Sequence, residues 1–523
     1  MNQTAFVSKT LVLLVVASAS FSADGKEGAL AGRIAEVINA QEFKTAHWGI
    51  LLADQETGKT LYEHNAGKLF TPASVTKLFS VAAALDAFGP DHRFETSVYR
   101  RGEVADSGEL KGDLILVAGG DLTLGGRSDK EGRLAFTNVD HTYANDIAVH
   151  ALTEPDPVAG LNELARQIAS IGIKRIRGDV VIDDRLFEKG EGDSGASGPT
   201  RLTPIMVNDN VIDFLITPAK DGQPAAVEWR PKTAALVIDV LVETGSSSEA
   251  PDIKIASPAA GRMVVRGRIP ESSKPLVRIR EVDDPAGFAR ALFIEALGRC
   301  GVAGDASLLA ANRTELLPPP RRYRSEERVA LLPSLPFSEE ARLVLKVSHN
   351  LHASAVPLLV AVKHGRQTLA DGLRLQHDFL ARAGVDVDTI SFADGVGGSR
   401  GDCTTPLATV QLLRYMATRP DFAAYEQALP ILGEDGTLAT TVAPNSPARG
   451  RVRAKTGTLY WENTMNGGFL LMSKALAGYL TTAKGNKFVF AMFVNNVLLQ
   501  KSTETARVGA VLGRLCEIIC EHQ

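Results

Sequence analysis

The stretch that decides the fold of this 523-residue chain is TPASVTKLFSVAAALDAFGP, residues 71–90. Thr71 is suited to cap a helix and Pro72 to fill the first helical position. Gly89 and Pro90 predict the end of that helix. Because apolar side chains fall on nearly every face between these limits, we expect a buried central helix.

Ser74 and Lys77 stand out on this otherwise apolar helix. Residues three apart share a helix face, so the hydroxyl and the amine can meet. The helix N-terminus favours negative charge on the Ser74 oxygen. Lys77 either extends to solvent or is buried and loses basicity, and in the second case it can take the serine proton. Taken alone, the pair favours the solvent-exposed lysine.

Two more short motifs follow in order, Ser348-His349-Asn350 and Lys455-Thr456-Gly457. Together with Ser74-Val75-Thr76-Lys77, each pattern of this kind occurs once in the chain. We expect Ser348 to relay a proton to a leaving amine and Asn350 to hold a substrate carbonyl. The ordered set is a far stronger signal of acyl transfer than any one motif.

The third motif has the residues needed to bind an anionic substrate terminus at an edge strand. Lys455 supplies positive charge and Thr456 a hydroxyl, while Gly457 allows a substrate backbone to approach closely. The backbone N–H groups of Ser74 and Thr458 are candidates for an oxyanion hole.

Composition sets the broad class. Basic residues number 57 and acidic residues 61, for a net charge of −4, and 45% of residues are hydrophobic. These values indicate a folded globular chain and argue against nucleic-acid binding. The ten histidines include no His-Glu-x-x-His, so a zinc hydrolase is not supported. The pairing of the four cysteines, Cys300, Cys403, Cys516 and Cys520, stays open.

The length of the chain is explained by an insertion, because the sequence pattern of its middle differs from that of its two ends. Residues 27–95 and 331–523 show both helix and strand patterns, and we expect them to form one α/β catalytic domain. Residues 96–330 read as a large, mainly β insertion, organised as two nested accessory units. Residues 1–22 resemble a signal peptide with the apolar core at 11–16, and no later stretch reaches transmembrane length.

Local patterns predict several elements. A β-hairpin is expected over residues 48–64, with a second hairpin turn at Gly485-Asn486 before a strand over 488–494. Short strands are expected near 113–118, 179–182 and 235–241. Helices are expected over residues 158–171, 285–299, 338–348, 350–364, 404–418 and 503–520.

The three motifs resemble those of the penicillin-recognising serine transpeptidase and β-lactamase superfamily. The insertion directly after the first motif is similar to that of the penicillin-binding protein 4 type of D-alanyl-D-alanine carboxypeptidase/endopeptidase, peptidase family S13. Further segments resemble that family over most of the chain: residues 119–124, 175–183, 207–210, 394–400 and 432–438.

The resemblance implies an α/β multi-domain fold whose serine β-lactamase/transpeptidase-like domain has an antiparallel sheet with helices on both sides. It implies an exported, periplasmic or otherwise extracytoplasmic carboxypeptidase, also a DD-endopeptidase, that cleaves peptidoglycan stem peptides through a Ser74 acyl-enzyme and is trapped by β-lactams. No metal or organic cofactor is needed for this reaction, and no nucleic acid or transmembrane anchor is expected. Peripheral association with wall or membrane is compatible with it.

The sequence departs from the family pattern at several places. His349 stands where the family usually has Asp or Asn, and we expect its side chain to point away from the site. Ser354 stands where a Glu is common. Residues 125–157 resemble extra loop material, with the polar residues Arg127, Lys130, His141 and His150.

Two rival functions remain. A serine β-lactamase is disfavoured because no Glu-x-x-Leu-Asn segment follows the Ser348 motif. A non-hydrolytic wall-binding or β-lactam-sensing module is disfavoured by the intact Ser74 and Lys77 pair and by the absence of a transmembrane stretch. Fast penicillin turnover would favour the first rival, and muropeptide binding without D-Ala release the second.

Overall fold

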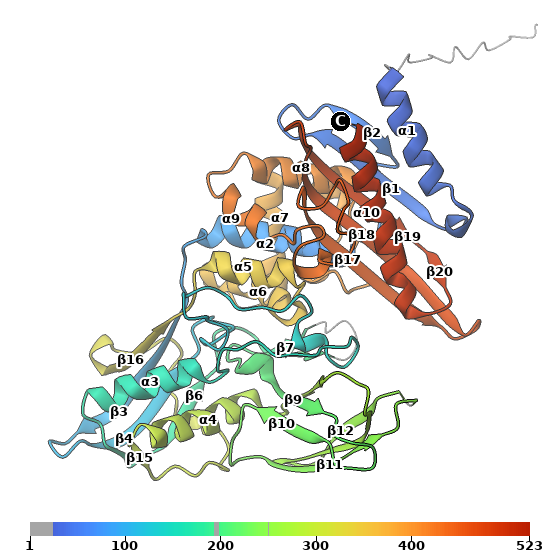
Figure 1. Cartoon of the computed structure of the whole chain (residues 1–523). Helices are drawn as coiled ribbons and strands as arrows, with labels where there is room; N and C mark the ends of the chain where they lie inside the picture. Colours follow the sequence, from blue (N-terminus) through green and yellow to red (C-terminus); the bar gives the residue numbers. More distant parts are fainter. Residues whose placement is uncertain (1–24, 193–197, 249, 523) are drawn as a thin grey trace, which may run out of the picture.

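The computed structural model describes residues 25–192, 198–248 and 250–522. The predicted signal peptide, residues 1–22, lies outside them. The described chain forms an upper part in which both ends of the sequence meet and a lower part made from its middle (Figure 1).

The upper part is built on one antiparallel sheet. Its strand order is β17 (Val452–Asn463), β18 (Gly468–Thr481), β19 (Lys487–Asn495), β1 (His47–Asp54) and β2 (Thr60–His64), and β20 (Val497–Leu499) pairs with β18. β1 lies against β19 with Ile50 opposite Met492, so the two ends of the chain share one sheet.

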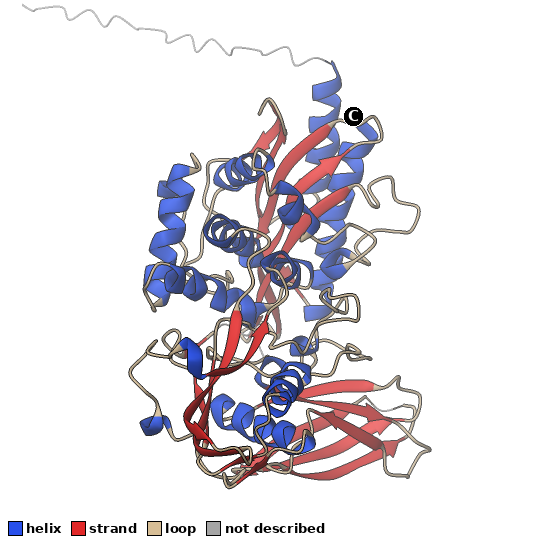
Figure 2. Cartoon of the chain, turned by 90° about the vertical axis from the view of Figure 1, so that its left-hand side faces the viewer, coloured by secondary structure: helices blue, strands red, loops and turns tan. Residues whose placement is uncertain are grey.

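Alternating side chains bury both faces of this sheet. In β19, Val489, Ala491 and Phe493 belong to the core cluster that includes α2 (Thr76–Phe88). The intervening Phe490 and Met492 belong to the cluster with α1 (Gly25–Ile38) and α10 (Thr505–His522). Helices therefore cover both faces, as Figure 2 shows, and the predicted fold class is confirmed.

The other helices of the upper part lie around α2 on one side of the sheet (Figure 1). They are α5 (Phe337–Lys346), α6 (Asn350–Lys363), α7 (Leu369–Arg382), α8 (Pro406–Ala417) and α9 (Phe422–Gln427). The first ten residues of α2 are all buried, as expected for a central helix.

The predicted start of this helix is wrong. Residues Ala73–Val75 form a 3-10 turn, and α2 begins only at Thr76. Thr71 does not cap the helix, because Pro72 precedes the 3-10 turn and Val75 precedes α2, neither with a side-chain cap. The Thr71 carbonyl instead accepts hydrogen bonds from Ser473 Oγ at 2.7 Å and Asn495 Nδ2 at 3.2 Å. Tertiary contacts with the sheet thus replace the local capping that the sequence favoured.

The lower part contains a six-stranded sheet of β15 (Ala303–Gly304), β5 (Arg175–Ile176), β4 (Glu109–Val117), β3 (Glu95–Val104) and β16 (Arg328–Pro333), with β6 (Val180–Asp183) beside β4. Core residues of α3 (Ala159–Ser170) and α4 (Pro285–Arg299) pack in the same cluster as its strands. Two three-stranded sheets complete it: β10 (Ala226–Arg230), β9 (Val211–Thr217) and β14 (Leu276–Glu281); and β11 (Val237–Gly245), β13 (Arg262–Pro270) and β12 (Asp252–Ala259). A short ribbon joins β7 (Gly190–Glu191) and β8 (Arg201–Leu202).

Most local predictions agree with the structure. The hairpin over 48–64 is β1 and β2, and the helix over 285–299 is α4. The other predicted helices differ at their ends by a few residues, within the usual uncertainty of boundaries. The four cysteines are free. Within the described ranges, no helix combines the length and apolarity that a membrane span requires.

Candidate active site

Ser74 lies in the 3-10 turn Ala73–Val75, which is wedged between two glycines of distant segments. A Cβ on Gly457 would lie 2.4 Å from the Pro72 carbonyl oxygen, and one on Gly397 would lie 1.9 Å from the Ala73 carbonyl oxygen. Only glycine permits this approach from both sides. The two contacts hold the serine turn against β17 and against the loop that contains Gly397.

Lys77 is completely buried, and its Nζ joins three predicted site residues. It lies 2.7 Å from Ser74 Oγ, 2.7 Å from Asn350 Oδ1 and 3.3 Å from Ser348 Oγ. The buried alternative for this lysine is therefore correct. Its amine is within direct proton-transfer distance of the Ser74 hydroxyl.

Lys455 approaches Ser348 from the opposite side. Its Nζ donates to Ser348 Oγ at 2.9 Å and to the Thr456 carbonyl at 2.8 Å. Burial, together with the positive charge of Lys77, lowers the pKa of Lys455 well below its ordinary value. Ser348 Oγ thus lies between two buried amines, and a proton can pass along this row.

The Ser348 loop is held from both parts of the molecule. Ser348 has a φ of 63°, an uncommon conformation for a residue with a side chain. The Tyr143 hydroxyl, from the middle part of the chain, donates to the Ser348 carbonyl at 2.5 Å. Tyr143 is a functional candidate that the sequence did not single out, because nothing local connects it to a motif 205 residues away.

The Lys455-Thr456-Gly457 segment lies on β17, the edge strand of its sheet, as predicted. The outer side of β17 pairs with Ile431 at Arg453. Beyond that bridge, the backbone groups of an edge strand can pair with an extended peptide. The Thr456 hydroxyl donates to Thr437 Oγ1 at 2.9 Å, and Thr458 Oγ1 accepts from Lys474 Nζ at 2.8 Å. These contacts orient the two hydroxyls at the outer edge.

The loop that contains Gly397 is fixed by two carboxyl groups. Asp394 Oδ1 accepts the N–H groups of Val396 and Gly397 at 2.7 and 2.6 Å. Asp402 accepts from the Ala393 N–H at 2.7 Å, and burial beside Asp394 raises the pKa of Asp402 to about 7. The loop thereby supports the serine turn without containing a predicted catalytic residue.

Two polar residues of the predicted extra loop, Arg127 and His141, are buried. Arg127 is buried and pairs with Asp140 at 2.7 Å and with Asp209 at 2.6 Å. His141 is buried as well and contacts Asp213 at 2.5 Å. The His349 side chain points toward this group, away from Ser74, as expected. Residues 125–157 form loops with one 3-10 turn, His141–Tyr143, as predicted, but Arg127 and His141 are buried within them.

The structure brings Ser74, Lys77, Ser348, Asn350 and Lys455 into one chain of contacts next to an edge strand. A hydroxyl beside a buried amine is the arrangement of an activated nucleophile. With the helix-covered antiparallel sheet, these features define a serine hydrolase of the acyl-enzyme class.

Comparison of the chain with known protein families identifies its family within this class. The sequence profile of the D-Ala-D-Ala carboxypeptidase 3 (S13) family matches residues 30–513. The chain belongs to this family and is a serine-type D-Ala-D-Ala carboxypeptidase.

Individual relatives agree with this membership. The chain is 29% identical over 441 residues to a D-alanyl-D-alanine carboxypeptidase of Actinomadura sp. (strain R39), covering 80% of this chain and 74% of that relative. It is 23% identical to D-alanyl-D-alanine carboxypeptidase DacB of Haemophilus influenzae, covering 86% and 85%. The crystal structure of penicillin binding protein 4 (dacB) from Haemophilus influenzae has a TM-score of 0.66 at 21% identity, covering 92% of this chain and 98% of the other.

Proposed function

We propose that the protein is an exported serine D-Ala-D-Ala carboxypeptidase, and additionally a DD-endopeptidase, that acts on peptidoglycan stem peptides through an acyl-enzyme on Ser74. The single observation that carries the proposal is the 2.7 Å contact between Ser74 Oγ and the buried Lys77 Nζ. Family membership supplies the substrate class.

In the first half-reaction, Ser74 Oγ attacks the carbonyl carbon of the penultimate D-Ala and its proton passes to Lys77. The backbone N–H groups of Ser74 and Thr458 stabilise the oxyanion. The C–N bond then breaks, and the leaving D-Ala amine takes, through Ser348, the proton that Lys77 accepted, while Lys455 holds the Ser348 hydroxyl; Lys77 is then neutral again.

In the second half-reaction, water attacks the ester carbon and Lys77 takes the water proton. The C–O bond to Ser74 breaks, and the proton returns to Ser74 Oγ. Asn350 holds the substrate amide during both steps, since its Oδ1 is fixed by Lys77 at 2.7 Å. β-Lactams would be opened in the same first step and remain as the acyl group.

The substrate terminus would bind along β17. Lys455 offers positive charge and the Thr456 hydroxyl a hydrogen bond to the terminal carboxylate. Gly457 allows close approach on one side while its own backbone packs against the serine turn. The site thus combines anion recognition with the nucleophile on neighbouring elements.

We further propose that residues 27–95 and 331–523 form the catalytic domain, and that residues 96–330 are an insertion of two nested units that shapes access of wall polymer. The pairing of β1 with β19 supports the split domain. β16 pairs with β3 within the sheet of the lower part, which supports a return to the catalytic domain near residue 331. An export segment at residues 1–22 would deliver the enzyme to the periplasm or another extracytoplasmic space.

The experiment that tests the proposal uses the purified protein with a D-Ala-D-Ala pentapeptide and with cross-linked muropeptides, and reads the products by mass. We expect loss of one D-Ala from the pentapeptide and cleavage of the cross-link, with neither product in Ser74→Ala. Binding without any release of D-Ala would contradict the proposal and favour a wall-binding module. Rapid penicillin hydrolysis without D-Ala release would favour a β-lactamase.

A further inference from the structure

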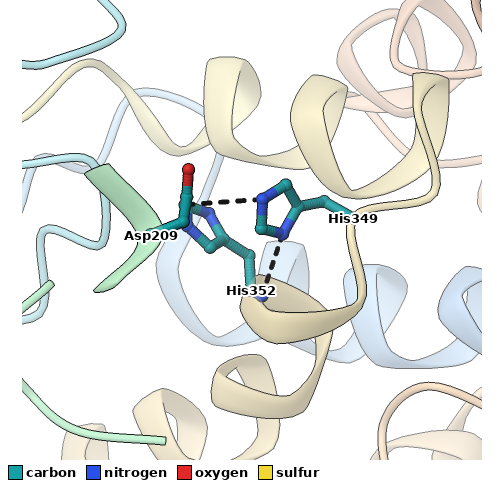
Figure 3. A group of neighbouring side chains, drawn as sticks. All are labelled: Asp209, His349 and His352. Carbon is teal, nitrogen blue, oxygen red and sulfur yellow. Dashed lines mark hydrogen bonds and ion pairs between the residues drawn. The ribbon is translucent and has the colours of Figure 1, made fainter. Parts of the chain in front are cut away.

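A buried group of metal-ligating side chains lies directly behind the Ser348 loop. Figure 3 shows Asp209 facing His349 and His352, which flank the start of α6. His352 Nε2 lies 2.7 Å from Asp209 Oδ1, and His349 Nε2 lies 3.4 Å from the same oxygen. Asp140 Oδ1 lies 3.6 Å from His349 Nε2. None of these four side chains is more than 3% exposed.

His349 Nε2 is the atom that a simple hydrogen-bond network does not explain. It is fully buried, and within the described part of the chain it makes no hydrogen bond. Its separations of 3.4 and 3.6 Å from the carboxylate oxygens of Asp209 and Asp140 are long for a hydrogen bond. The 3.4 Å separation from Asp209 matches two ligands of one tetrahedral metal ion, which lie about 3.4 Å apart when each bond is about 2.1 Å.

The donor set has the chemistry of a transition-metal site. Two imidazoles with carboxylates suit Zn²⁺ and its neighbours rather than Ca²⁺ or Mg²⁺, which favour oxygen ligands alone. Glu340 Oε1 lies 2.8 Å from His352 Nδ1, so a carboxylate can hold the ring proton there. A metal ion would then replace the proton that His352 Nε2 shares with Asp209 Oδ1 at 2.7 Å. Arg127 donates to Asp209 Oδ2 at 2.6 Å, which leaves Asp209 Oδ1 facing the imidazoles. Asp140 Oδ1, in contrast, already accepts from Thr142 and Arg127.

We propose that Asp209, His349 and His352 form a structural site for one divalent transition-metal ion of the zinc type. Binding would place the His349 ring proton on Nδ1. The 3.3 Å contact in which that nitrogen accepts the His352 N–H would then be given up. The metal bonds replace this long contact.

The proposed metal site lies next to the active-site loop, so a bound ion could hold that loop in place without taking part in the reaction. His349 lies between Ser348 and Asn350, both of which contact Lys77. Asp209 comes from the middle of the chain, so the metal would tie that part to the start of α6. The ion would therefore stabilise the junction and fix the Ser348 loop, and it would take no part in acyl transfer.

Metal analysis of the full enzyme tests this inference independently of any catalysis. Metal-depleted protein is titrated with Zn²⁺ against a chromophoric chelator, and bound metal is counted after dialysis. We expect one tightly bound Zn²⁺ per chain, a higher unfolding temperature with the metal, and a tetrahedral visible spectrum on Co²⁺ substitution. His352→Gln should lose all three properties, whereas His377→Gln should keep them, because His377 is exposed on α7 and outside the cluster.

Circular dichroism shows whether the His352→Gln protein is folded. If it is not, Asp209→Asn and the Co²⁺ spectrum of the wild-type enzyme decide the question. Failure of the wild-type enzyme to bind one equivalent would overturn the metal site, as would equal binding by a folded ligand variant. Penicillin acylation of the metal-free enzyme keeps the two proposals apart, since the Ser74 adduct can form whether or not a metal binds.

Discussion

Replacement of Gly457 by alanine probes how tightly the nucleophile turn is packed against the edge strand. The new Cβ would lie 2.4 Å from the Pro72 carbonyl oxygen and 3.3 Å from the Ala73 Cβ. Since ordinary carbon–oxygen contacts begin at about 3.3 Å, the strand and the turn must separate by about 1 Å. A displacement of this size between nucleophile and oxyanion donors costs about 100-fold in rate, or about 2.7 kcal/mol of transition-state stabilisation.

The assay is the second-order rate of acylation by a fluorescent penicillin, together with the thermal unfolding midpoint. We expect Gly457→Ala to acylate about 100-fold more slowly, with a loss of folding stability of about 1–3 kcal/mol from overpacking. Gly67→Ala is the matched control, because a Cβ there meets nothing within 4 Å. A folded Gly457→Ala protein that acylates at the wild-type rate would refute the described packing and the reasoning built on it.

Three further predictions address the surroundings of the nucleophile. Ser348→Ala interrupts the row between Lys77 and Lys455 and should lower kcat for D-Ala release by about 100-fold; an unchanged kcat would remove Ser348 from the proton path. Tyr143→Phe loses the hydrogen bond to the Ser348 carbonyl and should cost about 1 kcal/mol of stability and about fivefold in acylation rate, and thermal unfolding and acylation that both match wild type would contradict this. The pKa of Asp402 is raised to about 7, so between pH 4 and 7 the folded protein keeps this proton while the unfolded protein has lost it. The contribution of Asp402 to folding stability is therefore fully present below about pH 4 and is lost as the pH rises through 7. Asp402→Asn should therefore show a smaller fall in denaturant-measured stability between pH 5 and 8 than wild type, and parallel curves for the two proteins would refute the shift.

The residues of the three motifs could be predicted because acyl transfer needs recognisable groups at short spacings. The spacing of Ser74 and Lys77 correctly indicated that hydroxyl and amine meet. What spacing could not show was whether Lys77 is buried, since that depends on α5, α6 and the sheet packing around α2. The order of the motifs along the chain could not predict the distances between them. In the structure, Lys455 Nζ donates a hydrogen bond to Ser348 Oγ.

The features that the sequence did not reveal depend on contacts between distant segments. Thr71 had a good local capping signal, but its backbone is held by Ser473 and Asn495. The burial and pairing of Arg127 were not predicted, because its carboxylate partner Asp209 is 82 residues away. Local propensity describes such positions poorly, because burial and pairing are decided by the tertiary fold.

The central claim is that Ser74 is the acylated nucleophile. The most direct measurement is the intact and peptide mass of the protein after brief treatment with penicillin. We predict a mass increase of one penicillin per chain, located on the peptide that contains Ser74, and no increase in Ser74→Ala. An adduct on another residue, or one that persists in Ser74→Ala, would contradict the account.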